Sequence, residues 1–202
     1  VGTTRELSLP RVVPTRHTVH IDSFLFSIIA PSMESRVINR YEGTEPGPLL
    51  ICIGAIHGNE PAGLLAIQEV FRLLDIEKIA NPGFTYFGSF VGLRGNEKAI
   101  KQKQRFIHRD LNRMLLQEEV DRILSLPPED WTAEDQECIE LIRTIEAEIA
   151  KYRPPLTLIL DLHTTTADGG IFTISADDPL SSTLGKGLHA PVILGFLENL
   201  KG

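Results

Sequence analysis

Two histidines and a glutamate have the residue types and the spacing of a metal site. His57 and Glu60 lie on a glycine-containing turn, His57-Gly-Asn-Glu60, at the end of an apolar run, and His163 follows a second apolar run much later in the chain. Catalytic zinc sites commonly use two His and one Glu and keep a fourth position open for water. Zinc in such a site lowers the pKa of bound water and polarises a scissile carbonyl. We therefore expect one zinc ion per chain, held by His57, Glu60 and His163.

Two buried strands must bring these three residues together. Residues 49–56 and 156–162 are short apolar runs rich in branched side chains, which is typical of strands buried on both faces of a sheet. If these strands are parallel, they end at the same sheet edge, where open α/β sheets bind their ligands. Strands alternate with helices along the chain, which predicts an α/β fold with a mixed, centrally parallel sheet flanked by helices.

Periodicity and turn residues predict the remaining elements. Helices are expected at residues 61–74, 115–126, 132–151 and from about 177, and further strands at 18–30, 36–41, 84–93, 171–175 and 192–197. We expect an extended arm over residues 1–16 and a turn over residues 42–48. Residues 95–114 are polar, basic and poorly periodic, which predicts a functional loop over the sheet edge.

The composition excludes several classes of protein. The chain has 202 residues, 42% of them hydrophobic, which is enough for one substantial core in one domain. Twenty basic and 27 acidic residues give a net charge of -7, which argues against a nucleic-acid partner. Two cysteines do not make a disulfide framework, and no apolar run reaches the length of a membrane span. We expect a cytoplasmic protein without a membrane partner.

Three motifs in order resemble one known family. His57-Gly-Asn-Glu60, Asp110-Leu-Asn-Arg113 and Asp161-Leu-His-Thr-Thr165 are similar to the succinylglutamate desuccinylase and aspartoacylase family, whose members are zinc amidohydrolases with a carboxypeptidase-like fold. The likeness covers roughly residues 48–175, and three ordered motifs are far more specific than any one of them. The resemblance implies hydrolysis of the amide bond of a small anionic N-acyl amino acid.

The resemblance also implies roles for residues that bind the substrate. Arg105 stands where relatives use an arginine to polarise the amide carbonyl, and Asn112 and Arg113 stand where relatives bind a substrate carboxylate. The chemistry agrees, because a guanidinium grips a carboxylate through two parallel hydrogen bonds and a developing oxyanion needs a fixed cation. Asn96 matches a further family position, with support of the loop as the alternative interpretation.

Two aspartates are expected to act on other side chains. Asp161 precedes His163 by two residues, so both side chains leave the same face of a strand, and Asp161 can orient a ligand imidazole. The alternative is a strand-end carboxylate held by backbone N–H groups. Asp110 is expected to position the arginines and not to react. The other histidines match no partner motif and are predicted to be structural or at the surface: His17, His20, His108 and His189.

The sequence departs from the family pattern at the general base. In the family, the base is a glutamate in a motif resembling Glu-x-Gly downstream of the third ligand, and no such motif follows His163. Glu198 ends an apolar run, but its Glu-Asn-Leu-Lys context does not fit. The β-rich C-terminal part of the family is missing as well. We therefore expect residues 1–202 to be one N-terminal, zinc-binding catalytic domain of a longer protein.

Two other functions stay open at the level of the sequence. A metallocarboxypeptidase shares the His-x-x-Glu motif, and its Asn-Arg pair binds a terminal carboxylate. A non-catalytic, metal-stabilised module that binds a carboxylated ligand would need no general base. The sequence leaves a homo-oligomer open.

Overall fold

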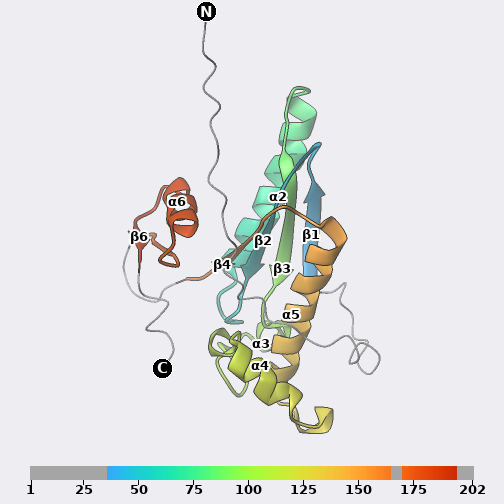
Figure 1. The fold of residues 1–202 in the computed structure, drawn as a ribbon, viewed down its shortest axis with the longest axis vertical. Coiled ribbons are helices and arrows are strands. Elements are labelled where there is room, and N and C mark those ends of the chain that lie inside the picture. The colour runs from blue at the N-terminus through green and yellow to red at the C-terminus, as the bar shows by residue number, and fades with distance from the viewer. Residues whose placement is uncertain (1–35, 165–169, 195–202) are drawn as a thin grey trace, which may run out of the picture.

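A four-stranded sheet forms the centre of the computed structural model, which describes residues 36–164 and 170–194 (Figure 1). The strand order is β1-β3-β2-β4. β2 runs parallel to both of its neighbours, β3 and β4, whereas β1 is antiparallel to β3. The mixed, centrally parallel sheet predicted from the sequence is confirmed. The strands are β1 (Val37–Glu42), β2 (Glu45–Gly54), β3 (Phe87–Arg94) and β4 (Thr157–Leu162).

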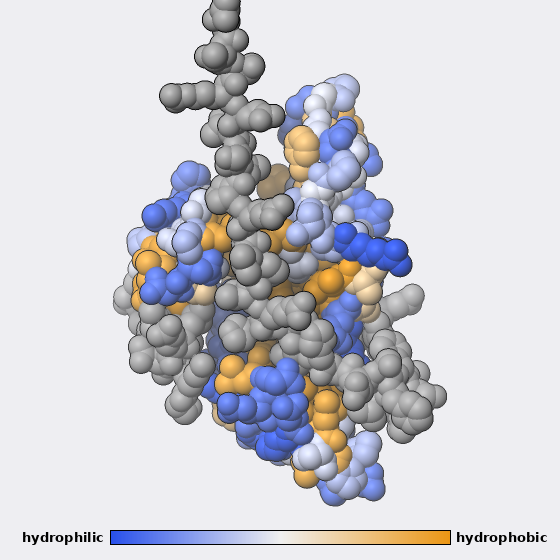
Figure 2. Space-filling view, in the orientation of Figure 1, coloured by the Kyte–Doolittle hydropathy of each residue, from blue (hydrophilic) through white to orange (hydrophobic). Residues whose placement is uncertain are grey.

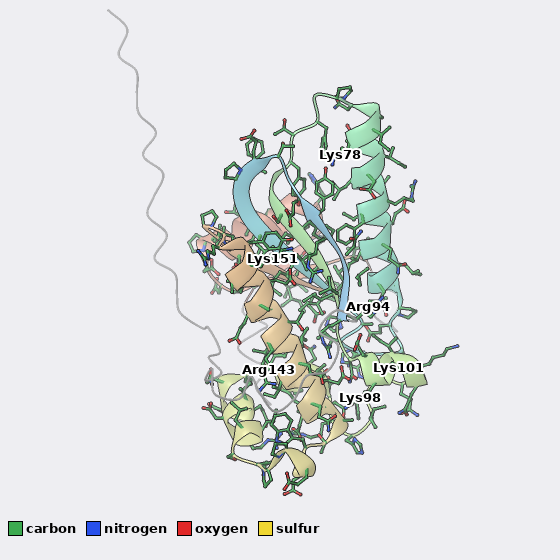
Figure 3. The ribbon with its side chains drawn as sticks, turned by 90° about the vertical axis from the view of Figure 1, so that its right-hand side faces the viewer. Lys78, Arg94, Lys98, Lys101, Arg143 and Lys151 are labelled. Carbon is green, nitrogen blue, oxygen red and sulfur yellow. The ribbon has the colours of Figure 1, made fainter. Side chains whose placement is uncertain are left out.

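Two long helices, α2 (Ala62–Ala80) and α5 (Ala133–Tyr152), cover opposite faces of this sheet (Figure 3). Ile67 and Phe71 of α2 pack with Phe90 in one apolar cluster. Ile139 and Leu141 of α5 pack with core residues of β2 and β3 in the other cluster. Because β2 is covered on both sides, its sequence is a continuous apolar run and does not alternate.

The two cysteines lie in different clusters. Cys52 belongs to the cluster beneath α2, and Cys138 belongs to the cluster beneath α5. Both thiols are free and buried, and burial raises the pKa of each to about 12. They are therefore separated by the sheet and protonated at neutral pH.

The predicted start of α5 is confirmed. The Thr132 side chain accepts a hydrogen bond from the Asp135 N–H, and the Asp135 carboxylate accepts one from the Thr132 N–H. This capping box satisfies two backbone donors that an open helix end would leave without partners.

The remaining elements lie at the ends of the sheet and beside it. A second sheet pairs β5 and β6 in parallel, and exposed apolar side chains gather around it and α6 (Figure 2): Phe172, Leu184, Leu188, Ile193 and Leu194. None of the helices in the described part of the chain could cross a bilayer. The elements are α3 (Glu97–Gln102), η2 (Leu111–Arg113), α4 (Gln117–Leu124), η3 (Pro128–Asp130), β5 (Thr173–Ile174), α6 (Pro179–Gly187) and β6 (Val192–Ile193).

Two sequence predictions were wrong in part. Residues 42–48 were expected to form a turn, but β2 already begins at Glu45, which pairs with Phe87 ahead of a register shift. Strand pairing overrides the Pro and Gly residues there, since an irregularity accommodates them. The loop predicted over residues 95–114 contains α3 and η2. These elements are too short to give a clear helical period, and each depends on a side-chain cap.

Other differences concern element ends. α2 continues to Ala80, past the predicted end near residue 74, because its last turn combines good helix formers with exposed Ile76 and Ile79. Apolar side chains on an exposed face hide the amphipathic pattern on which the prediction relied. The predicted arm over residues 1–16, the strand over residues 18–30 and Glu198 lie outside the described residues.

The buried core makes a first prediction about stability. Leu93 on β3 is fully buried, so Leu93→Ala should lower the free energy of unfolding by about 2–5 kcal/mol through lost burial and a residual cavity. The matched control is Leu65→Ala on α2, where the side chain is 63% exposed, with an expected change under about 0.5 kcal/mol. Urea unfolding measures both, and equal losses would contradict this packing.

Candidate metal centre

The predicted metal ligands come from the ends of two neighbouring parallel strands. β2 pairs with β4 in a register that sets Gly54 opposite Leu162. His57 and Glu60 follow β2, and His163 follows β4, so all three lie at the same edge of the sheet. The sheet edge expected from the sequence is therefore the place where these side chains meet.

The geometry of the three side chains suits one metal ion. One potential ligand atom from each of His57, Glu60 and His163 lies within 4.8 Å of the other two. His57 Nδ1 is 2.9 Å from Glu60 Oε1, and His163 Nδ1 is 3.4 Å from Glu60 Oε2. Two imidazole nitrogens and a carboxylate at this separation fit a divalent cation that accepts nitrogen and oxygen ligands.

Each imidazole uses its other nitrogen to contact an aspartate. His57 Nε2 lies 2.9 Å from Asp110 Oδ1, and His163 Nε2 lies 2.5 Å from Asp161 Oδ2. Ligand histidines in metal sites characteristically donate their outer N–H to a carboxylate, which fixes the ring and raises its basicity. Both Nδ1 atoms are left to face Glu60. This contact supports the first of the two interpretations of Asp161.

Asp110 makes more contacts than the sequence indicated. We expected it to position arginines, and one carboxylate oxygen does lie 3.6 Å from Arg105 Nη2. The other oxygen contacts His57 and accepts the backbone N–H of Asn112. A motif of adjacent residues cannot show which distant imidazole its aspartate will reach, so sequence reasoning missed the contact with His57.

Electrostatics keep Glu60 charged. Burial alone would raise the pKa of this carboxyl, but the Thr164 N–H and the two imidazoles outweigh it and hold the pKa below its ordinary value. The hydrogen bond to Asp161 raises the pKa of His163. A proton on His163 competes with a metal ion for the same side chain, so metal affinity should weaken as the pH falls.

Arg105 lies beside the centre and remains accessible. Its Nη1 is 3.2 Å from Glu60 Oε1, and 49% of its side chain is exposed. Arg113 is exposed on η2, next to the half-buried Asn112. The structure thus brings Arg105 to the candidate metal ligands and leaves Arg113 exposed at the surface. The roles of Arg105, Asn112 and Arg113 toward a substrate remain predictions.

Asn96 is fully buried, and its side chain makes hydrogen bonds to other residues of the protein. Its side-chain oxygen accepts the Ala99 N–H at 3.0 Å and so caps α3, while its amide nitrogen donates to Glu134 Oε1 at 3.2 Å. These contacts agree with loop support, which was the alternative to substrate binding for this residue. Direct binding of substrate by Asn96 remains a prediction.

Glu134, in the first turn of α5, was not singled out from the sequence. It is fully buried, and its carboxylate accepts the backbone N–H groups of Ile107, His108 and Arg109 at 2.7, 3.0 and 3.3 Å. These residues connect Arg105 to Asp110. The available signal was an acidic residue near a helix start, which usually indicates only a favourable interaction with the helix dipole.

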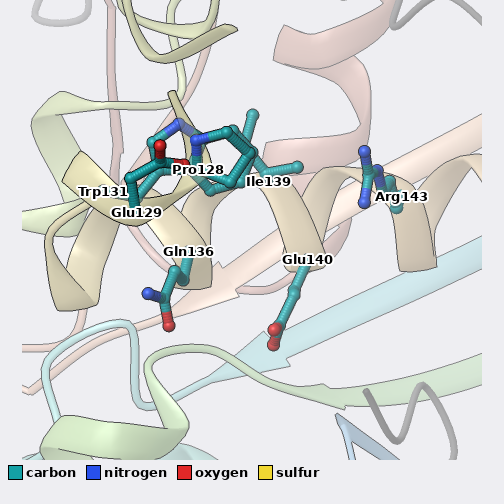
Figure 4. Close-up of a pocket in the computed structure, with 7 residues that line it drawn as sticks. All are labelled: Pro128, Glu129, Trp131, Gln136, Ile139, Glu140 and Arg143. Atoms are coloured by element: carbon teal, nitrogen blue, oxygen red, sulfur yellow. The ribbon is translucent and has the colours of Figure 1, made fainter. Parts of the chain in front are cut away.

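A separate cavity of about 320 Å³ lies beside η3 and α5 (Figure 4). The Arg143 Nε atom on α5 is buried there and has no hydrogen-bond partner among the described residues. None of the metal-ligand candidates lines this cavity, so it is not the metal centre. Its lining consists of Pro128, Glu129, Trp131, Gln136, Ile139, Glu140 and Arg143.

Known proteins are similar to the region of the chain that contains the candidate metal ligands. The family model described as the succinylglutamate desuccinylase/aspartoacylase catalytic domain matches residues 46–190. A probable aspartoacylase of Acaryochloris marina is 28% identical over 129 residues, covering 64% of this chain and 39% of the relative. A probable aspartoacylase of Nostoc sp. is 29% identical over 122 residues, covering 60% of this chain and 37% of the relative. The chain thus spans under two fifths of the length of these curated relatives.

Among solved structures, the succinylglutamate desuccinylase of Chromobacterium violaceum is similar to this chain with a TM-score of 0.47 and 19% identity. The match covers 73% of this chain and 49% of that one. At this level of similarity, the match carries no argument about the site, and the carboxypeptidase-like form of the fold remains a prediction.

The buried carboxylate of Glu134 makes a prediction about pH. Burial raises its pKa, but the N–H groups of Ile107 and His108 outweigh this and lower it below the ordinary 4.5. A carboxyl with a lowered folded-state pKa stabilises the fold above its ordinary pKa, and that stability is lost as the pH falls through the folded value. The difference in unfolding free energy between wild type and Glu134→Gln should therefore be full at neutral pH and shrink below about pH 4.5.

Chemical denaturation at a series of pH values measures this difference. Glu69→Gln is the control, because Glu69 forms an exposed pair with Arg72 that solvent screens, and its effect should be much smaller at every pH. A constant difference between wild type and Glu134→Gln from neutral to acidic pH would contradict the prediction.

Proposed function

The chain belongs to the succinylglutamate desuccinylase/aspartoacylase family, and from this premise we propose that it is the metal-binding part of a zinc-dependent hydrolase of N-acyl amino acids. The observation that carries the proposal is the cluster of His57, Glu60 and His163 with the Arg105 guanidinium in contact with Glu60. When bound, zinc would supply a Lewis acid and a water of lowered pKa. We propose a small anionic N-acyl amino acid as the substrate class, which is supported by the family and by the Arg105 guanidinium beside the cluster.

The protein's own residues would prepare the zinc site. His57 and His163 present their Nδ1 atoms toward Glu60, and Asp110 and Asp161 hold the outer nitrogens. This arrangement fixes both rings before a metal ion arrives. Two His and one Glu with room for a further ligand is the donor set of many catalytic zinc sites, which favours zinc over harder cations.

Arg105 would act on the reacting amide. A guanidinium beside the metal ligands can donate hydrogen bonds to the amide carbonyl oxygen as negative charge develops on it. Its pairing with Glu60 and Asp110 limits its freedom before substrate binds. Asn112 and Arg113 would bind a substrate carboxylate and so set the position of the scissile bond.

The described part of the chain offers no side chain that we can assign as the general base. Among the described residues, Glu60 is committed to the metal cluster, and Asp110 and Asp161 are committed to the histidines. We place the base and the remaining wall of the substrate pocket in a C-terminal part outside this chain, in keeping with the length of the relatives. Residues 1–202 would then be one N-terminal domain. A cytoplasmic location and the absence of a nucleic-acid partner remain predictions.

Two alternatives have specific support. A carboxypeptidase would use Asn112 and Arg113 to bind a terminal carboxylate, and a comparison of N-acyl amino acids with peptides as substrates would separate the two enzymes. A non-catalytic binding module gains from the lack of a base among the described residues. It would bind zinc and a carboxylated ligand without hydrolysing any member of a broad acyl panel.

The zinc site makes a direct prediction. The purified chain should contain or take up one zinc ion, and the double variant His57→Ala, His163→Ala should lose it, because only one of the three ligands remains. His189→Ala is the matched control, since this imidazole is exposed and is not one of the three clustered ligands, and it should bind zinc as the wild type does. Elemental analysis after reconstitution measures all three proteins. Equal zinc in the double variant would refute the site.

The catalytic role of Arg105 makes a second prediction. In the full-length protein, Arg105→Ala should lower kcat about 10²–10³-fold with little change in KM, as expected for a group that acts mainly on the transition state. Arg113→Ala should mainly raise KM, because it would bind the substrate carboxylate. Lys101→Ala, at an exposed position of α3, is the charge-matched control and should leave both constants unchanged. Steady-state kinetics decides, and an unchanged kcat in Arg105→Ala would remove Arg105 from the mechanism.

A further inference from the structure

Glu134 is a buried carboxylate that is linked to the metal centre through the backbone and does not contact the three candidate ligands. Its Oε1 accepts hydrogen bonds from the Ile107 N–H and the Asn96 side chain, and its Oε2 accepts them from the N–H groups of His108 and Arg109. Burying a carboxylate is costly unless hydrogen bonds replace its water shell. Four donors and the N-terminal end of α5 meet this requirement, so Glu134 remains charged inside the protein.

The three backbone donors lie between two residues that contact the metal ligands. Arg105 precedes them and contacts Glu60, and Asp110 follows them and contacts His57. The chain has few ways to move Arg105 or Asp110 while Ile107 and Arg109 stay hydrogen-bonded to Glu134. The position of both site residues is therefore coupled to one carboxylate on another element.

Other contacts on this segment are weaker anchors. The Arg109 side chain pairs with Glu119 at 3.0 Å and lies 4.0 Å from Asp135, but 40% of it is exposed, so solvent screens both pairs. The Arg105 carbonyl accepts the Gly58 N–H at 3.2 Å, which ties the segment to the turn that carries His57. None of these contacts involves a backbone N–H of residues 107–109, whereas Glu134 accepts all three of these N–H groups.

We propose that Glu134 is a positioning residue that anchors residues 107–109 and thereby holds Asp110 against His57 and Arg105 beside Glu60. This inference rests on the proposed function, because it assigns Glu134 to the same centre. Asp110 then contributes to metal affinity as the outer partner of a ligand imidazole, and Glu134 contributes through Asp110. Removing the anchor should weaken metal binding even though Glu134 is not a ligand.

The test is a double-mutant cycle on zinc affinity in the chain. Glu134→Gln keeps the size of the side chain but replaces one acceptor oxygen with an NH₂ group that faces backbone N–H donors. It should weaken zinc binding about 10-fold, within the range for loss of an outer-shell partner. Asp110→Asn should weaken it by at least as much, and the double variant should bind no worse than Asp110→Asn alone. Competition with a chelator of known affinity measures each dissociation constant.

Glu148→Gln is the matched control, because Glu148 is another buried carboxylate on α5 that pairs with Arg40 at 2.6 Å. It should lose stability and keep the zinc affinity of the wild type. Normal zinc binding in Glu134→Gln, or losses that multiply with those of Asp110→Asn, would overturn the proposal. If Glu134→Gln does not fold, Glu134→Asp keeps the charge with a shorter reach and should show an intermediate affinity, and wild-type affinity in that variant would count against the anchor.

Hydrogen exchange separates this proposal from the proposed function. The amides of Ile107, His108 and Arg109 should exchange slowly in the wild type and in Glu148→Gln, and much faster in Glu134→Gln. A wild-type chain that binds no zinc would overturn the proposed function. The exchange rates would still test whether Glu134 holds residues 107–109 in place. Unchanged exchange at these three amides in Glu134→Gln would show that Glu134 does not hold the segment.

Discussion

The parallel pairing of β2 with β4 is the constraint on which the centre depends. The Gly54–Leu162 register brings the ends of two strands together that are far apart in sequence, and it sets His57 and Glu60 beside His163. Register in a buried strand is strongly specified, because a slip of one residue would turn its side chains to the opposite face. The two apolar clusters on either face of β2 therefore position the three candidate metal ligands as well as stabilise the fold.

Around this pairing, a series of carboxylates binds imidazoles and backbone N–H groups and so holds them in place. Glu60 faces both imidazoles, Asp110 and Asp161 hold their outer nitrogens, and Glu134 holds the backbone that carries Asp110. The contacts form a continuous series that runs from the three candidate ligands to Glu134 in the first turn of α5. A preorganised site of this kind has less conformational entropy to lose when a ligand binds, which is how distant residues can affect affinity.

The sequence predicted those parts that depend on local pattern. Apolar runs indicated β2 and β4, the capping residues Thr132 and Asp135 marked the start of α5, and the motifs picked out the three side chains that lie together at the sheet edge. Contacts between distant residues were not predictable, since no spacing relates Glu134 to Ile107 or Asp110 to His57. Short elements such as α3 were missed because a single helical turn or two gives no period, and a buried cap at Asn96 forms the helix instead.

The described residues would supply one part of the chemistry of the proposed reaction, the stabilisation of negative charge, and not the other part, the transfer of a proton. The described side chains at this edge of the sheet suit an electrophilic role: three candidate metal ligands, a guanidinium beside them, and two carboxylates that contact imidazoles. A group that takes and returns a proton must be free to change its charge, which the pairing of Asp110 and Asp161 with the ligand histidines opposes. In the proposed hydrolase, the group that transfers the proton would then have to come from an element other than those that carry the three candidate ligands and their aspartate partners.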